Sequence, residues 1–156
     1  MQKPNISVKA IAEIVINVDD IGRARAFYET VLGVQLHSQF PAENPTIVFL
    51  TLAELDSPLG RGGHPQLLAL IDPHRHPPAQ QRFRGLDVTV SSLNHLAFEI
   101  APETYESEKQ RLAALGLTVH EETFPNMNAK ALFFQDPEGN TLEFICHASS
   151  RTSGSI

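Results

Sequence analysis

The second half of the chain opens with Leu93-Asn94-His95-Leu96-Ala97-Phe98-Glu99-Ile100, whose alternating apolar residues predict a strand. Successive side chains of a strand point to opposite faces, so one face would be apolar and the other would carry His95 and Glu99. A histidine at the head of a strand is ordinary by itself. It becomes informative because the first half of the chain opens in the same way, with Glu13 in the place of His95.

The first half predicts a strand, a helix and then three strands. Residues 11–18 alternate as a strand, and Asp19 or Asp20 is expected to cap the helix that follows. This helix should run to about Leu32 and end at Gly33 in the left-handed conformation. Its buried stripe is expected to consist of Ile21, Ala24, Phe27, Tyr28 and Val31. Strands are expected over about 34–40, 46–54 and 66–71.

The second half repeats this order. After the strand around His95, a helix should start at Pro102 and end at Gly116. Its buried stripe is expected to consist of Tyr105, Leu112 and Leu115. Strands are expected over 117–123, 130–135 and 141–147, with the last two joined by the hairpin turn Asp136-Pro137-Glu138-Gly139-Asn140.

Overlaying the two halves places Glu13 on His95 and Gly33 on Gly116, within one residue. Such an internal repeat indicates one supersecondary unit used twice. The predicted fold class is therefore α+β, with two βαββ modules (a βαβββ-type repeat) that form a curled mixed sheet around a concave site.

The expected organisation is an N-terminal extension over 1–10, a first module over 11–72, a linker over 73–92, a second module over 93–147 and a flexible tail over 148–156. Within the linker, His74 and His76 resemble a metal-binding pair, but the prolines around them favour a solvated connection. Arg82 or Arg84 could instead reach over a pocket and meet an anionic ligand.

Composition restricts the class of protein. The chain has 156 residues, of which 42% are apolar and 19% charged, and its formal net charge is -6. These values are typical of a globular domain and argue against nucleic acid or an anionic membrane surface as a partner. There is no apolar run long enough to span a membrane, and the N-terminus lacks the pattern of a signal peptide. The single cysteine, Cys146, excludes an internal disulfide and favours a reducing compartment, so a cytoplasmic location is expected.

Three chemically active side chains fall on the polar sides of predicted strands: Glu13, His95 and Glu143. If the apolar sides pack on the helices, all three point into the concave site. The overlay also places Gln66 opposite Glu143. Carboxylate, amide and imidazole donors that converge in this way can bind a divalent metal such as Zn, Ni, Mn, Fe or Mg. A metal with an open position would polarise a substrate oxygen, and Glu143 or Glu13 would act as general base.

The halves resemble the modules of the vicinal oxygen chelate superfamily, which includes glyoxalase I, fosfomycin-resistance transferases, extradiol dioxygenases and bleomycin-binding proteins. The motifs that carry this resemblance are Glu13 to Ile21, Ala24-Arg-Ala-Phe-Tyr-Glu-Thr-Val-Leu-Gly33, Asn94-His95-Leu-Ala-Phe and Phe134 to Phe144.

The resemblance implies a set of metal ligands. Glu13 stands where many members place a histidine, while His95 and Glu143 match the ligands of the second module. Gln66 lies near a carboxylate ligand of glyoxalase I. Asn17 replaces the arginine that glyoxalase I uses for glutathione, so glutathione is not the expected substrate. Members with two modules in one chain are mostly dimers, and whether the modules pair within or between chains is left open.

The preferred hypothesis is a glyoxalase-like divalent-metal enzyme of lyase or isomerase type, acting on a small oxygenated substrate. The alternative is a metal-free protein that binds and sequesters a small molecule, as bleomycin-resistance proteins do. An extradiol-type dioxygenase ranks third, because that chemistry requires two histidines and one carboxylate. At residue level, the alternatives are a strand histidine satisfied by backbone for His95 and an arginine-paired carboxylate for Glu143.

Overall fold

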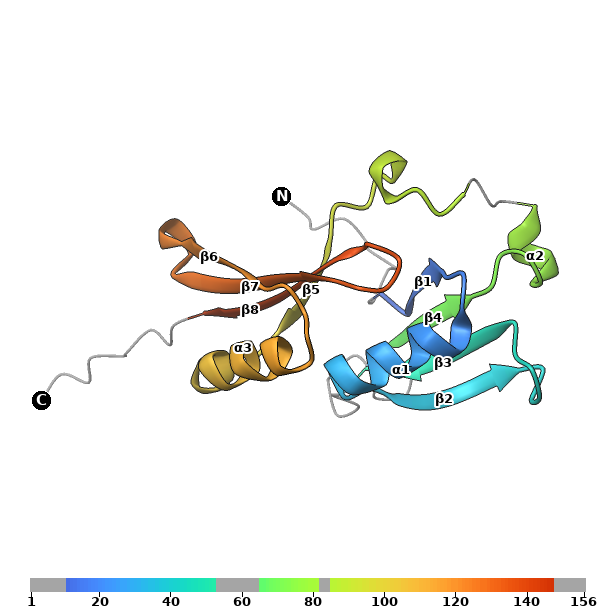
Figure 1. Cartoon of the computed structure of the whole chain (residues 1–156), viewed down its shortest axis with the longest axis horizontal. Coiled ribbons are helices and arrows are strands. Elements are labelled where there is room, and N and C mark those ends of the chain that lie inside the picture. The colour runs from blue at the N-terminus through green and yellow to red at the C-terminus, as the bar shows by residue number, and fades with distance from the viewer. Residues whose placement is uncertain (1–10, 53–64, 82–84, 148–156) are drawn as a thin grey trace, which may run out of the picture. The chain divides into compact units, whose positions relative to one another are not determined.

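The computed structural model describes residues 11–52, 65–81 and 85–147 (Figure 1). The chain divides into two compact units between residues 86 and 87. Each unit contains one four-stranded mixed sheet and one long helix. The predicted α+β class, with one supersecondary unit used twice, is therefore confirmed.

The first unit has a sheet with the strand order β1-β4-β3-β2. The elements are β1 (Glu13–Asn17), α1 (Ile21–Leu32), β2 (Gln35–Phe40), β3 (Ile47–Thr51) and β4 (Leu67–Ile71). Strands β1 and β4 run parallel, and the other two pairs are antiparallel. A parallel pair needs a crossover connection, and here α1, β2 and β3 lie between the two strands in sequence.

Local signals determine the ends of α1 as predicted. The Asp20 side chain accepts a hydrogen bond from the Arg23 amide at 2.9 Å, which satisfies one of the free N–H groups of the first turn. Gly33 ends the helix with φ 69°, a conformation that a side chain would disfavour. Four of the five residues of the predicted stripe are buried, while Phe27 is half-buried with its edge against Tyr28.

Two short helices follow the first sheet, namely α2 (Pro77–Gln80) and a 3-10 turn over Val88–Val90. His74 and His76 do not face each other as a metal pair. Nδ1 of His76 lies 3.0 Å from the Thr46 hydroxyl, whereas Nε2 of His74 lies 3.9 Å from an Asp19 carboxylate oxygen. Arg82 and Arg84, the N-terminal extension, residues 53–64 and the tail lie outside the described residues.

The second unit repeats the arrangement with the strand order β5-β8-β7-β6. Its elements are β5 (Leu96–Glu99), α3 (Tyr105–Ala114), β6 (His120–Phe124), β7 (Ala129–Gln135) and β8 (Thr141–His147), with 3-10 turns over Pro102–Thr104 and Pro125–Met127. The β7–β8 turn is held by Asp136, whose Oδ1 accepts from the amides of Glu138 and Asn140 at 2.9 and 2.8 Å.

Two predictions for this unit need correction. The segment that begins at Pro102 starts as a 3-10 turn, and the α-helix begins only at Tyr105. Leu115 was expected in the buried stripe, but it is 44% exposed. It lies at the C-cap, where the chain leaves the helix, so helical spacing no longer governs its direction.

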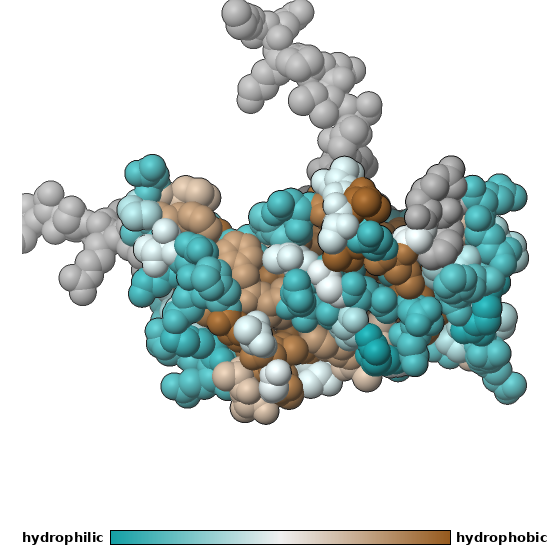
Figure 2. Space-filling view, turned by 45° about the horizontal axis from the view of Figure 1, so that its top comes forward, coloured by the Kyte–Doolittle hydropathy of each residue, from teal (hydrophilic) through white to brown (hydrophobic). Residues whose placement is uncertain are grey.

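The second sheet has two chemically different faces, because its side chains alternate. The helix face is the one on the α3 side, and β8 contributes Leu142, Phe144 and Cys146 to it, all buried. The His95 face is the opposite one, and β8 contributes Glu143 to it. On the molecular surface shown in Figure 2, hydrophilic side chains are interspersed with apolar patches. Within the described residues, none of the helices has the length and apolar character that a membrane span requires.

Candidate active site

The core of the candidate site is a contact between His95 and Glu143. The strands that carry them, β5 and β8, are parallel neighbours, and Ala97 pairs with Glu143 in the register. His95 lies just ahead of β5, and its Nε2 is 3.0 Å from Oε2 of Glu143. The Glu143 side chain is only 5% exposed and that of His95 is 35% exposed. The carboxylate is therefore buried, and the imidazole faces solvent on one side.

Asn94 fixes the orientation of this imidazole. Its Oδ1 lies 2.6 Å from Nδ1 of His95. An amide oxygen can only accept, so Nδ1 must be the protonated nitrogen that donates to it. In neutral imidazole this leaves a lone pair on Nε2, which points at the carboxylate of Glu143. Two acceptors at 3.0 Å are stable only if a cation lies between them, either a proton or a metal ion.

The geometry fits a divalent metal as well as a proton. Two donor atoms that bind one ion at about 2.1 Å and at right angles lie about 3.0 Å apart, which is the distance between His95 and Glu143. Imidazole nitrogen and carboxylate oxygen are both ordinary ligands for Zn, Ni, Mn and Fe. Within the described residues, however, no group of three or more His, Cys, Asp or Glu side chains is assembled for a metal. The second unit thus supplies two metal donors, His95 and Glu143, and not a complete set of ligands.

Phe133 forms an apolar wall beside this pair. It is the direct cross-strand partner of Glu143, so its side chain emerges on the His95 face. Its ring lies edge-on to the imidazole of His95, with centroids 5.7 Å apart and planes at 85°. An aromatic ring in this place limits the access of water to the carboxylate. The sequence alone assigned no role to Asn94 or Phe133, although Asn94 stands next to His95 in one of the motifs.

The first unit has no carboxylate at the position equivalent to Glu143. If Glu13 corresponds to His95, then the pair Val15–Ala69 corresponds to the pair Ala97–Glu143. The overlay that put Gln66 opposite Glu143 is therefore wrong by three residues.

The antiparallel neighbours agree with this correction, since Phe49 pairs with Ala69 as Phe133 pairs with Glu143. The side-chain amide of Gln66 donates to the Ile11 carbonyl at 3.4 Å. Glu13 is exposed at the start of β1. The ligand role of Glu13 stays a prediction. That of Gln66 is also untested, but the register gives it no support.

Comparison with known families supports a relationship over most of the chain. The family model described as Glyoxalase/Bleomycin resistance protein/Dioxygenase superfamily matches residues 10–144. Among curated proteins, none matches the chain significantly.

Several solved structures share the fold. The genomically encoded fosfomycin resistance protein FosX from Listeria monocytogenes has a TM-score of 0.64 at 16% identity, over 91% of this chain and 96% of that one. Lactoylglutathione lyase from Agrobacterium tumefaciens has a TM-score of 0.61 at 24% identity, over 90% and 96%. A glyoxalase/dioxygenase from Nostoc punctiforme has a TM-score of 0.65 at 22% identity, over 95% and 97%. At these identities the likeness is one of fold.

Proposed function

Because the chain belongs to the Glyoxalase/Bleomycin resistance protein/Dioxygenase superfamily, we propose that it is a divalent-metal enzyme of glyoxalase-like type that acts on a small oxygenated molecule. The observation that carries this proposal is the contact between Nε2 of His95 and Oε2 of Glu143, two atoms that can both bind a metal, 3.0 Å apart. In this proposal His95 and Glu143 are metal ligands. Glu13 is the predicted third ligand.

A divalent ion at this place would supply Lewis-acid polarisation of a substrate oxygen. The carboxylate of Glu143, or that of Glu13, is proposed to accept the proton that becomes acidic next to the polarised oxygen. Asn94 holds the imidazole of His95 in the tautomer that leaves Nε2 free to bind, as hydrogen-bond partners of ligating histidines commonly do. Phe133 keeps water from the carboxylate on one side.

Complexes of structurally similar proteins support a metal and a small oxygenated ligand. One FosX structure is a mutant complexed with Mn(II) and 1S,2S-dihydroxypropylphosphonic acid, and it has a TM-score of 0.65 to this chain at 17% identity. Another FosX structure contains Mn(II) and a sulfate ion. We transfer to this chain only the class of ligand, a small molecule whose oxygens can reach a metal. The proposal includes a homodimer in the cytoplasm, which chromatography with light scattering and fractionation of cells would test.

Metal analysis tests the proposal. Protein purified without chelator should contain a divalent ion, and calorimetric titration of the chelator-treated protein should show one high-affinity site per chain for Mn²⁺, Ni²⁺ or Zn²⁺. His95→Ala should weaken this binding by at least about tenfold, which corresponds to about 1.4 kcal/mol. If no divalent ion co-purifies, none binds on titration and His95→Ala changes nothing, the enzyme proposal fails.

A metal-free binding protein is the second candidate. The same 3.0 Å contact favours it, because a hydrogen bond with a single shared proton accounts for the distance without a metal. In that case the His95 face would bind a small molecule without converting it. Binding of a ligand by chelator-treated protein, unchanged when metal is added, would identify this function.

A further inference from the structure

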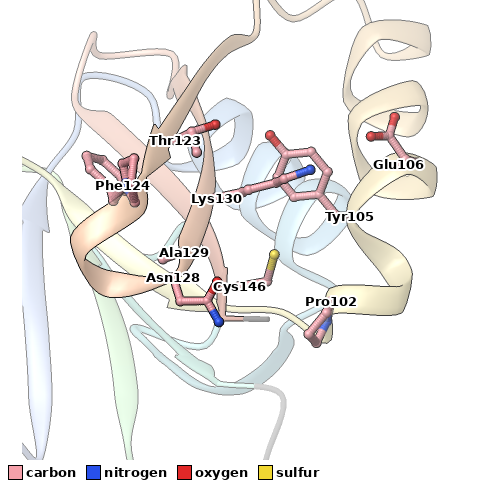
Figure 3. A pocket seen from close by; sticks show the side chains of 10 residues that line it. Pro102, Tyr105, Glu106, Thr123, Phe124, Asn128, Ala129, Lys130 and Cys146 are labelled. Carbon is pink, nitrogen blue, oxygen red and sulfur yellow. The ribbon is translucent and has the colours of Figure 1, made fainter. Parts of the chain in front are cut away.

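A cavity lies on the helix face of the second unit. It has a volume of about 300 Å³ and lies between the start of α3, the turn after β6 and the paired strands β7 and β8. Figure 3 shows the side chains that line it, with Tyr105 and Lys130 near its centre and the sulfur of Cys146 pointing the same way. Cavities of this size are at the lower end of the range for small-molecule sites.

This cavity is separate from the His95–Glu143 site. Lys130 and Cys146 are direct cross-strand partners, so both side chains emerge on the same face of the sheet. Glu143 is three residues from Cys146 along β8, which places it on the opposite face. The proposed active site and this cavity therefore use opposite sides of one sheet.

The ring of Tyr105 is held firmly in the cavity wall. Its hydroxyl donates to Oε2 of Glu121 at 3.1 Å and lies 3.3 Å from the Ala131 carbonyl oxygen. Lys109 in turn holds Glu121, with Nζ 2.5 Å from Oε1. Burial, together with the neighbouring Glu121, raises the pKa of Tyr105 to about 12, so the phenol is neutral at ordinary pH.

Lys130 brings a positive charge to this wall. Its ammonium lies 5.6 Å from the centroid of the Tyr105 ring, in a cation–π arrangement. Among the described residues, Lys130 makes no ion pair within 4 Å. The nearest acidic influence is Glu121, which pairs with Lys109 and whose pKa the charges of Lys109 and Lys130 help to lower. The rest of the lining is largely apolar and includes Phe124 and Pro102. Glu106 also lines the cavity, but from the helix side (Figure 3).

We propose that this cavity is a second small-molecule site, which binds a monocarboxylate with a compact aromatic body. The carboxylate would pair with the ammonium of Lys130, and the aromatic body would lie against Tyr105 and Phe124. A charged hydrogen bond of this kind is stronger than a neutral one. The carboxylate of Glu106 would disfavour a second anionic group on the same ligand.

Three probes with the same aromatic body and different charge test the proposal: 1-naphthoate, 1-naphthalenemethanol and 1-naphthylmethylamine. Calorimetry should rank their affinities in this order. Lys130→Met should weaken 1-naphthoate about tenfold while leaving 1-naphthalenemethanol within about twofold. Arg111→Met is the matched control, because it removes a cation of α3 that pairs with Glu108 and does not line the cavity, and it should leave 1-naphthoate binding within about threefold. Glu106→Gln should maintain or tighten that binding.

Cys146 provides an independent readout of where the probe binds. It is the single cysteine of the chain and lines the cavity. Because Cys146 is only 4% exposed, a small thiol reagent should reach it through the cavity in the free protein, and saturating 1-naphthoate should slow the labelling at least fivefold. A thiol that does not react at all in the free protein would show that the cavity does not admit small molecules. His95→Ala should leave both the protection and the affinity unchanged, which separates this site from the proposed active site.

Any one of five results would overturn the inference. These are equal affinity for the three probes, unchanged 1-naphthoate affinity in Lys130→Met, a Cys146 thiol that does not react in the free protein, a Cys146 thiol that saturating probe does not protect, and loss of 1-naphthoate binding in His95→Ala. None of the five bears on whether the protein binds a metal, so the proposed function can fail or succeed independently.

Discussion

Nε2 of His95 lies 3.0 Å from Oε2 of Glu143, and the other ring nitrogen of His95 lies 2.6 Å from Oδ1 of Asn94. The imidazole is thus fixed from both sides, with a neutral acceptor at Nδ1 and a carboxylate at Nε2. This arrangement gives the ring one protonated nitrogen and one nitrogen available to a cation. Because the ring is fixed in this way, His95 and Glu143 present one donor atom each at a defined distance from each other.

The first prediction concerns Asn94. Asn94→Ala removes the acceptor that holds the imidazole of His95, so the ring can rotate or change tautomer. We expect metal affinity to fall about 10- to 100-fold, as for other partners of ligating histidines, while stability changes little because Asn94 is exposed. Asn94→Asp retains an acceptor and should keep most of the affinity. Calorimetric titration of both variants checks this, and equal affinities in Asn94→Ala and the unmodified protein would contradict it.

The second prediction concerns the strand register of the first unit. Ala69, and not Gln66, occupies the position equivalent to Glu143. Gln66→Ala should therefore change metal affinity by less than about twofold, whereas Glu143→Gln should reduce it by at least about tenfold. Titration of the two variants in parallel makes the comparison. A tenfold loss in Gln66→Ala would restore Gln66 as a ligand and argue against the register-based assignment.

The third prediction concerns stability at alkaline pH. Burial and the Glu121 hydrogen bond raise the pKa of Tyr105 to about 12, above its value of about 10 in the unfolded chain. The folded state therefore holds this proton more tightly. The resulting stability is fully present below about pH 10 and is lost as the pH rises towards 12.

Urea unfolding of Tyr105→Phe checks this prediction. Loss of the hydroxyl should destabilise the variant by about 1–2 kcal/mol at pH 8, and the difference from the unmodified protein should shrink between about pH 10 and pH 11.5. The variant keeps the aromatic ring in the cavity wall, so a change in stability cannot be attributed to lost packing of the ring. A difference that stays constant over this pH range would show that the phenol does not titrate as described.

The fourth prediction concerns Asp72, at the end of β4. Burial would raise the pKa of this carboxyl, but the Arg75 side chain and the amides of His74 and Arg75 outweigh burial and lower it below 3.8. A lowered pKa stabilises the fold above the unfolded value and stops doing so as pH falls through the folded value. Asp72→Asn should be about 1–2 kcal/mol less stable at pH 7, and this difference should diminish below about pH 4.

Acid and urea unfolding of Asp72→Asn and Arg75→Gln measure this effect. Arg75→Gln removes one cause of the lowered pKa, so it should show a weaker dependence on pH than the unmodified protein. An Asp72→Asn variant that is equally stable at pH 7 would show that these hydrogen bonds do not stabilise the fold.

Local signals explain why much of the fold was predictable. Asp20, Gly33 and the turn that begins at Asp136 each act within a few residues, and the structure places all three as predicted. The internal repeat also made it possible to predict that His95 and Glu143 lie close together. The two sheets have the same order of strands, and in the second sheet His95 lies just ahead of β5 and Glu143 in the neighbouring strand β8. These inferences needed no knowledge of tertiary contacts.

Other features depend on contacts that the sequence does not encode locally. The shift from Gln66 to Ala69 arises because an overlay across loops of unequal length cannot fix the register, which the hydrogen bonds between strands set. Phe133 meets Glu143 only through the pairing of β7 with β8. The cavity beside Lys130 depends on where α3 lies on its sheet, so no motif could have indicated it.

The central claim is that His95 and Glu143 bind a common divalent ion. Pulsed electron paramagnetic resonance of the chelator-treated protein, loaded with one equivalent of Mn²⁺, tests it most directly. We expect coupling of the ion to one imidazole nitrogen, which disappears in His95→Gln and persists in His74→Gln and His120→Gln. Absence of imidazole coupling in the Mn²⁺-loaded protein, or its survival in His95→Gln, would contradict the claim.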